Sequence, residues 1–214
     1  MSFSEMNEIE LVELPAHRIF EELGYQTLEG TDVHSERQSY NDVILTTRLE
    51  RKIRELNPDL PEIVYETTIN QVKSLSNPST IQNNQEFHQM LLAGVKVPFQ
   101  SEGQTKYYAV RLVDFENPQN NDFAAVRQLI VLQHKQKRLD HVLFVNGLPL
   151  VILEYKDPTN PAADIVAAHK QLGIGNYQKH IPRIFNYNAF LIISDKTYAR
   201  YGTMTAPFER FSDW

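Results

Sequence analysis

In the segment RLDHVLFVNGLPLVILEYKDP, Asp140 precedes a turn signal, and Glu154 and Lys156 follow it. Asn-Gly at positions 146–147 favours a tight β-hairpin turn. With a two-residue loop, Asp140 would lie opposite Leu153. With a three-residue loop, Asp140 would lie opposite Glu154, and directly opposed side chains have Cβ atoms about 5 Å apart. Lys156 is two residues beyond Glu154 and therefore shares its face of the strand.

Two opposed carboxylates repel each other unless one is protonated or a cation lies between them. Mg²⁺ suits such a pair, because it favours one or two carboxylates together with water and phosphate oxygens. A neighbouring lysine can orient a water or neutralise charge in the transition state, so these groups could support metal-assisted hydrolysis of a phosphodiester. The same spacing also arises by chance. In that case Asp140 simply begins a strand, and Glu154 and Lys156 form a solvated pair at a sheet edge.

The composition narrows the possible classes of protein. The chain has 214 residues, with 21 Lys and Arg against 27 Asp and Glu, for a net charge of −6. This balance argues against a chain that binds nucleic acid or a membrane surface through charge alone. The absence of cysteine excludes a disulfide scaffold, thiol catalysis and cysteine-ligated metals. No apolar run is long enough to cross a membrane, and the N-terminus lacks the pattern of a signal peptide.

The elements that must position the candidate residues fall into two parts. Apolar residues at helical spacing dominate the first part, and β-branched strand-like segments dominate the second. Helices are expected at 16–23, 45–56, 64–75, 80–93 and 161–177. Strands are expected at 95–99, 106–115, 123–133, 141–147, 148–156 and 189–195. This order predicts an α/β or α+β fold with a central mixed sheet flanked by helices.

The amino-acid sequence around these residues, and not only their spacing, resembles a known family. LDHVLFVNGLPLVILEYK resembles the catalytic hairpin of PD-(D/E)xK nucleases, and in particular of the N-terminal endonuclease domain of HsdR, the R subunit of type I restriction enzymes. ELPAHRIFEELGY resembles the opening helix of that domain, and NDF followed by Gln128 resembles its first core strand. IPRIFNYNAFLIISD and ARYGTMTAPFERF resemble its closing strands, whereas residues 25–95 match only loosely.

The resemblance implies a role for each residue of the hairpin. Asp140 and Glu154 would ligate Mg²⁺ together with the backbone carbonyl of Tyr155, and Lys156 would position the attacking water. Glu13 would stand near the metal as an outer ligand. The alternative for Glu13 is an ordinary solvated carboxylate on a helix.

A glutamine and a tyrosine after the lysine form a further family motif, in which they lie four residues apart on one helix face. The candidates are Gln171 and Tyr177, which are six positions apart, with Gly173 and Gly175 between them. The two additional residues either loop out and preserve the contact, or Gln171 is merely a helical residue.

The run HKQKR at 134–138 is a compact basic patch just before Asp140. Lys135, Lys137 and Arg138 could contact DNA phosphates, or they could belong to a solvated turn.

Taken together, the resemblance implies a restriction-endonuclease-like fold with a mainly helical portion at 1–95 and the nuclease core at 96–214. The expected activity is that of a type I site-specific deoxyribonuclease acting on double-stranded DNA in a prokaryotic cytoplasm. ATP would bind only in a motor that follows residue 214, and the full-length R subunit would assemble with modification and specificity subunits. We expect the 214-residue fragment to cut DNA weakly or not at all. The alternatives are a non-catalytic docking module with a nuclease fold and a stand-alone repair nuclease.

Overall fold

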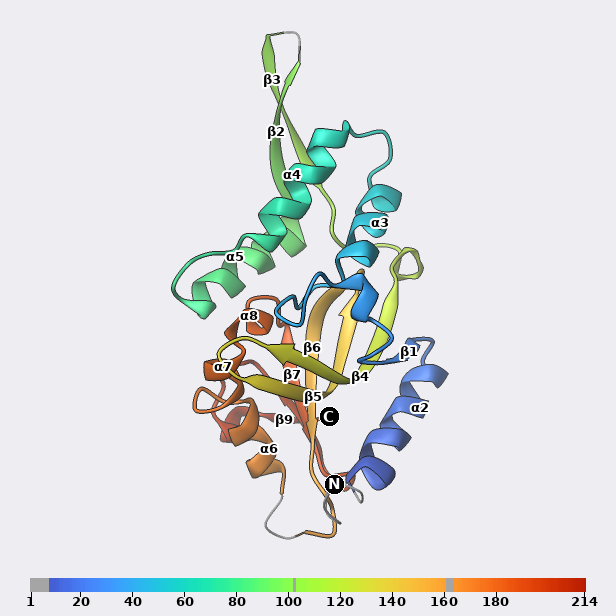
Figure 1. Ribbon diagram of the computed structural model, residues 1–214, viewed down its shortest axis with the longest axis vertical. Coiled ribbons are helices and arrows are strands. Elements are labelled where there is room, and N and C mark those ends of the chain that lie inside the picture. The colour runs from blue at the N-terminus through green and yellow to red at the C-terminus, as the bar shows by residue number, and fades with distance from the viewer. Residues whose placement is uncertain (1–7, 102, 161–163) are drawn as a thin grey trace.

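A seven-stranded mixed sheet forms the centre of the molecule in a computed structural model that describes residues 8–101, 103–160 and 164–214 (Figure 1). The strand order is β1-β4-β5-β6-β7-β8-β9. The β1–β4 and β6–β7 pairs are parallel and the other neighbouring pairs are antiparallel. The strands are β1 (Gln26–Glu29), β4 (Phe123–Leu132), β5 (Gln136–Val145), β6 (Leu148–Tyr155), β7 (Phe190–Ser194), β8 (Ala199–Gly202) and β9 (Ser212–Asp213). The predicted mixed α/β class is confirmed.

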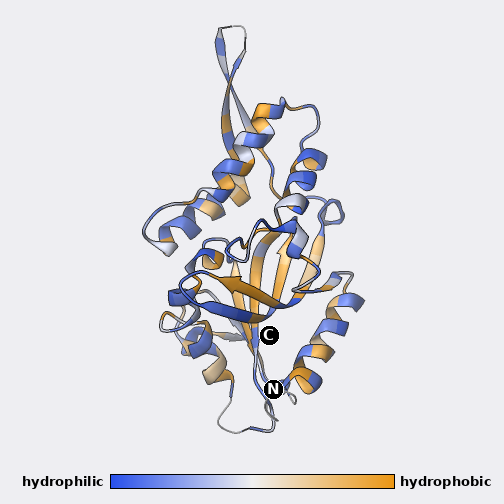
Figure 2. Cartoon of the chain, in the orientation of Figure 1, coloured by the Kyte–Doolittle hydropathy of each residue, from blue (hydrophilic) through white to orange (hydrophobic). Residues whose placement is uncertain are grey.

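Helices cover both faces of this sheet. A π-helical turn, η1 (Ile9–Glu13), continues into α2 (Leu14–Glu22), and this helix packs on one face against a small apolar core that includes Leu143, Leu153 and Ile192. The other face forms the main core with α3 (Thr46–Leu56), α6 (Ile165–Leu172), α7 (Tyr177–His180) and α8 (Pro182–Phe185). This core continues beyond the sheet to α4 (Glu62–Lys73) and α5 (Thr80–Ala93) (Figure 1). Because the central strands are buried on both sides, they are largely apolar (Figure 2).

The helices of the N-terminal part lie close to their predicted ranges, because local signals define their ends. The α5 helix is an example. The Ser79 hydroxyl caps its N-terminus by accepting from the backbone N–H of Gln82, and Gly94, with φ of 78°, follows its last turn. The hairpin of β2 (Val95–Ser101) and β3 (Gln104–Val110) extends away from the main body (Figure 1). Short 3₁₀ turns lie at η2 (His34–Glu36), η3 (Pro118–Asn120) and η4 (Phe208–Arg210).

The structure corrects one predicted helix. Instead of a continuous helix over 161–177, α6 ends at Leu172 and α7 begins at Tyr177. Gly173 has an extended backbone with ψ of 178°, which a helix cannot continue. Residues 161–163, where the predicted helix would begin, lie outside the described residues.

The β5–β6 hairpin combines features of both loops considered for it. Asn146 and Gly147 have φ of 53° and 82°, as a two-residue type I′ turn requires. The adjacent pairs follow this turn, but a β-bulge then shifts the register by one residue, so that His141 lies opposite Leu153. Leu150 is the additional residue, and its carbonyl accepts a hydrogen bond of 2.7 Å from Ala189. The register beyond the bulge sets Asp140 opposite Glu154.

Candidate active site

Asp140 and Glu154 lie on β5 and β6, near the middle of the sheet, and are 6% and 1% exposed. The Asp140 side chain accepts a 2.8 Å hydrogen bond from the backbone N–H of Tyr155, which ties it to the segment between Glu154 and Lys156. The Tyr155 side chain packs on the opposite face, in the small core. The role predicted for the Tyr155 carbonyl as a ligand stays a prediction.

Lys156 joins the same group. Its Nζ donates a 2.8 Å hydrogen bond to Oε1 of Glu154, and the lysine is itself 8% exposed. The other oxygen of Glu154, Oε2, is buried and has no hydrogen-bond partner among the described residues. A buried carboxylate oxygen without a donor costs free energy, so this atom is a candidate ligand for a cation. The three residues of the predicted motif therefore converge.

Glu13 reaches the site from η1 and is 2% exposed, which does not fit a solvated helix carboxylate. Its Oε2 accepts hydrogen bonds from Nε2 of Gln128 at 2.6 Å and from Arg127 at 3.4 Å, both on β4. The helical segment that precedes the sheet in sequence therefore contributes a buried carboxylate beside the β5–β6 hairpin.

Glu8 was not anticipated from the sequence. One carboxylate oxygen from each of Glu8, Glu13 and Asp140 lies within 4.8 Å of the others, and Glu8 also lies 4.0 Å from Nζ of Lys156. Residues five apart do not share a face in an α-helix, but the turn at Ile9–Glu13 is a wider π-helical turn, whose hydrogen bonds span five residues, and it brings the Glu8 and Glu13 carboxylates together. Single π turns occur frequently at functional sites.

Burial and mutual repulsion make the four carboxylates weak acids. The pKa of Asp140 is raised well above its usual value by burial and then by the charges of Glu154 and Glu13. Burial raises the pKa of Glu154 to about 7 although Lys156 opposes it, and burial also raises the pKa values of Glu13 and Glu8. Burial alone would lower the pKa of Lys156, but Glu154 outweighs it and the pKa is raised. Lys156 is therefore an ammonium ion at neutral pH.

The residues present fit a hard divalent cation. Three carboxylates offer converging oxygens, Glu154 offers a buried oxygen without a donor, and oxygen ligands are those that Mg²⁺ prefers. A bound cation would also relieve the repulsion that raises the pKa of Asp140. Perturbed acids gathered in this way are typical of functional sites.

Gln171 and Tyr177 are in contact despite their unusual spacing. The Gln171 amide donates a 2.8 Å hydrogen bond to the Tyr177 hydroxyl, which in turn donates to the carbonyl of Arg138 at 3.0 Å. The break between α6 and α7 therefore loops out and preserves the pair, and the pair fastens these helices to β5 two residues before Asp140.

The basic run lies beside this pair. The backbone N–H groups of His134 and Lys135 point at the carbonyl of His180, and Nζ of Lys137 lies 5.5 Å from the ring centre of Tyr177. Desolvation and then the charges of Lys137, Lys135 and Lys179 lower the pKa of His180, so these cations are close together. Among the described residues, no carboxylate pairs with Lys135, Lys137, Lys179 or Arg138.

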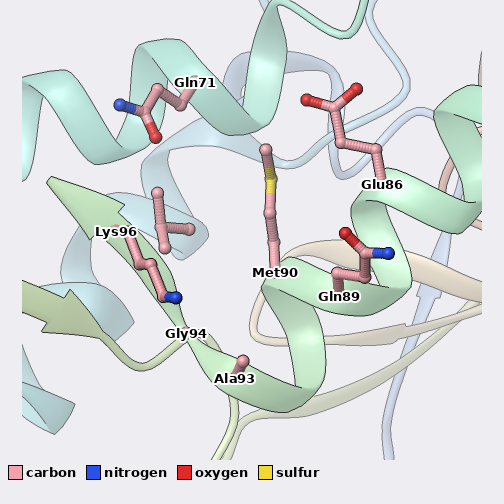
Figure 3. A pocket seen from close by; sticks show the side chains of 8 residues that line it. Gln71, Glu86, Gln89, Met90, Ala93, Gly94 and Lys96 are labelled. Atoms are coloured by element: carbon pink, nitrogen blue, oxygen red, sulfur yellow. The ribbon is translucent and has the colours of Figure 1, made fainter.

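A groove of about 450 Å³ lies elsewhere, between α4, α5 and the start of β2 (Figure 3). Gln71, Glu86, Met90 and Lys96 are among its lining residues, and none of the clustered acids contributes to it. The candidate chemistry is therefore separate from this hollow.

A mixed sheet whose central hairpin gathers buried carboxylates and one lysine defines a candidate metal-dependent hydrolytic site. The family model described as type I restriction enzyme R protein N terminus matches residues 5–210, and the chain belongs to this family. No helix among the described residues combines the length and apolar character needed to cross a membrane.

Two relatives cover nearly the whole chain. It is 37% identical over 216 residues to the type I restriction enzyme HindI endonuclease subunit of Haemophilus influenzae, which covers 98% of this chain and 20% of that protein. It is 33% identical over 220 residues to the putative type I restriction enzyme MjaIXP endonuclease subunit of Methanocaldococcus jannaschii, with 99% and 21% covered. The chain thus spans about a fifth of the length of these relatives, whose names support an endonuclease role.

Proposed function

We propose that this chain is the Mg²⁺-dependent nuclease domain of a type I restriction enzyme R subunit and hydrolyses phosphodiester bonds of double-stranded DNA. The observation that carries the proposal is the convergence of Asp140, Glu154 and Lys156 with Glu13 from a separate helix. Several buried carboxylates with a single lysine among them are costly unless they hold a ligand such as a metal ion. The names of the relatives, both endonuclease subunits of type I restriction enzymes, support the same class of activity.

The residues divide the work of hydrolysis. Asp140, Glu154, Glu13 and Glu8 would hold Mg²⁺, which when bound would polarise the scissile phosphate and lower the pKa of the attacking water. Lys156 is held by Glu154 and stays protonated, so it acts as a hydrogen-bond donor that orients the water and offsets negative charge in the transition state. It is not a general base in this arrangement.

The basic patch, defined as Lys135, Lys137, Arg138 and Lys179, would bind DNA phosphates beside the site. Its members lack carboxylate partners among the described residues, unlike cations such as Arg48, which is paired with Glu36 and Asp122. Phosphate contacts of this kind fix the position of DNA without reading its sequence. Recognition of a target would then belong to other subunits of the assembled enzyme.

The observed geometry favours catalysis over a docking module with a nuclease fold. A module of that kind requires no convergence of Asp140, Glu154 and Lys156, yet these groups meet in a buried cluster. A stand-alone repair nuclease is less well supported, because the curated relatives are about five times longer than this chain. From the family to which the chain belongs, we infer that an ATP-driven motor and partner subunits belong to the complete protein.

Replacement of Asp140 in the full-length R subunit, assembled with its partners, tests the proposal. Asp140→Asn preserves the shape of the side chain while removing its charge. We expect DNA cleavage to fall at least 100-fold, on the order of the loss of a major transition-state contact, while ATP hydrolysis is retained. Unchanged cleavage would remove Asp140 from the mechanism and favour the docking module.

A further inference from the structure

Gln128 has a backbone conformation that is unusual for its place in the fold. It lies within β4, yet its φ is 56°, in the left-handed region that residues other than glycine rarely adopt. The flanking pairs, Arg127 with His141 and Leu129 with Leu139, place it at the level of Asp140 on the neighbouring strand. The strain is therefore located beside the candidate metal site.

The alternation of side chains breaks at this level in both strands. Val126 and Leu129 both belong to the main core although they are three residues apart, and so do Leu139 and Val142 on β5. Regular strands place residues an even number apart on one face. The break allows Asp140 to meet Glu13, which arrives with η1 and α2, while the rest of each strand keeps its apolar contacts.

Gly30 makes room for this conformation. Its backbone N–H donates a 2.7 Å hydrogen bond to the carbonyl of Arg127, just after β1 ends. A Cβ atom added to Gly30 would lie 2.4 Å from the backbone oxygen of Gln128, closer than any side chain can approach. The path of β4 at Gln128 thus depends on a glycine in the adjacent segment.

The strained backbone directs the Gln128 side chain at Glu13. The amide Nε2 lies 2.6 Å from Oε2 of Glu13, the oxygen that Arg127 also contacts. The donors that contact Glu13 among the described residues bond to its Oε2. Its Oε1 is therefore available to bind a cation together with Glu8 and Asp140. Groups that orient a ligand through its second oxygen commonly contribute to metal affinity.

We propose that Gln128 is a positioning residue whose left-handed backbone, accommodated by Gly30, fixes the Glu13 carboxylate for cation binding together with Asp140. This inference rests on the proposed function, because it assigns the strain to a metal site. If Gln128 served only the fold, Gln128→Gly would relieve the backbone strain and leave cation binding unchanged.

The test compares Mn²⁺ binding by calorimetry with the urea midpoint of unfolding for the 214-residue chain. In Gln128→Gly the backbone is relaxed and the amide is lost, so we expect about tenfold weaker Mn²⁺ binding and an unchanged or higher urea midpoint. Asp59→Gly is the matched control, since Asp59 also has positive φ, at 64°, on an exposed turn. It should leave Mn²⁺ affinity unchanged.

Wild-type Mn²⁺ affinity in Gln128→Gly would overturn the positioning role while leaving the proposed function intact. Gly30→Ala, which keeps the amide but displaces the backbone beneath it, should weaken Mn²⁺ binding in the same direction if it folds. Failure of the wild-type chain to bind Mn²⁺, or equal binding by Asp140→Asn, would overturn the proposed metal site and this inference with it.

Discussion

Glu154 should destabilise the folded chain when no cation is bound. Burial raises its pKa from 4.5 to about 7, a value that already includes the attraction of Lys156. At about 1.4 kcal/mol for each tenfold change in proton affinity, this rise corresponds to about 3 kcal/mol. Glu154→Gln removes the charge and keeps an oxygen that can accept from Lys156. We therefore expect the variant to be more stable than the wild-type chain by up to about 3 kcal/mol at pH 8.5.

Proton binding at Glu154 determines how the free energy of unfolding changes with pH. Between pH 4.5 and about 7 the folded state binds more protons at Glu154 than the unfolded state does, so the free energy of unfolding of the wild-type chain falls as the pH rises through this window. The full penalty is present above it. The gain of Glu154→Gln should therefore be about 1.4 kcal/mol at pH 5.5 and about 3 kcal/mol at pH 8.5.

Urea unfolding in EDTA, followed by circular dichroism from pH 5.5 to 8.5, measures this difference. Glu209→Gln is the control, because Glu209 is exposed and should change stability by less than about 0.5 kcal/mol. Adding Mg²⁺ should stabilise the wild-type chain more than the variant, because ligand binding favours the folded state. A variant that is less stable than the wild type at pH 8.5, or a gain that does not depend on pH, would refute this account of the site.

Three further variants test the surroundings of the site. Gly147→Ala should cost about 2–4 kcal/mol, because φ is 82° and the new Cβ would lie 2.5 Å from the Leu45 carbonyl oxygen; equal loss in Gly24→Ala, which has positive φ but open space, would contradict the packing explanation. Tyr177→Phe should cost about 1–3 kcal/mol in urea unfolding through two lost hydrogen bonds, and a cost near zero would argue against them. Replacing Lys137 and Lys179 with alanine should reduce the salt dependence of DNA binding by about two phosphate contacts. The control Lys106→Ala, on β3, should leave the salt dependence of DNA binding unchanged.

Local signals explain how much of the fold was predictable. Helix α5 follows from Ser79 and Gly94 at its two ends, and the β5–β6 turn follows from Asn146-Gly147. The register at Asp140 does not follow from the turn alone, because the bulge at Leu150 depends on contact with Ala189, which is distant in sequence. Tertiary pairing therefore decides which carboxylates meet.

Two features that the sequence did not predict, the position of Glu8 and strand β1, have a similar explanation. Glu8 and Glu13 are five residues apart, a spacing that points to different faces of an α-helix, and only the π-helical turn brings them together. Strand β1 has four residues and was not predicted, because it gains its place by parallel pairing with β4. Spacing alone pointed to Asp140, Glu154 and Lys156 but left two interpretations open. Only the resemblance to a family pointed to Glu13 and favoured the catalytic interpretation.

The net charge of −6 conceals an uneven distribution of charge. Arg48, Arg51 and Arg54 are each paired with carboxylates, so the helix that carries them offers little positive potential to DNA. The basic patch lacks such partners among the described residues and lies beside Tyr177, next to the buried acids. Local potential rather than total charge determines where a polyanion binds. A patch of four cations supports only weak, salt-sensitive binding, so the proposed cleavage would be efficient only where a tethered part of a larger assembly raises the effective concentration of DNA.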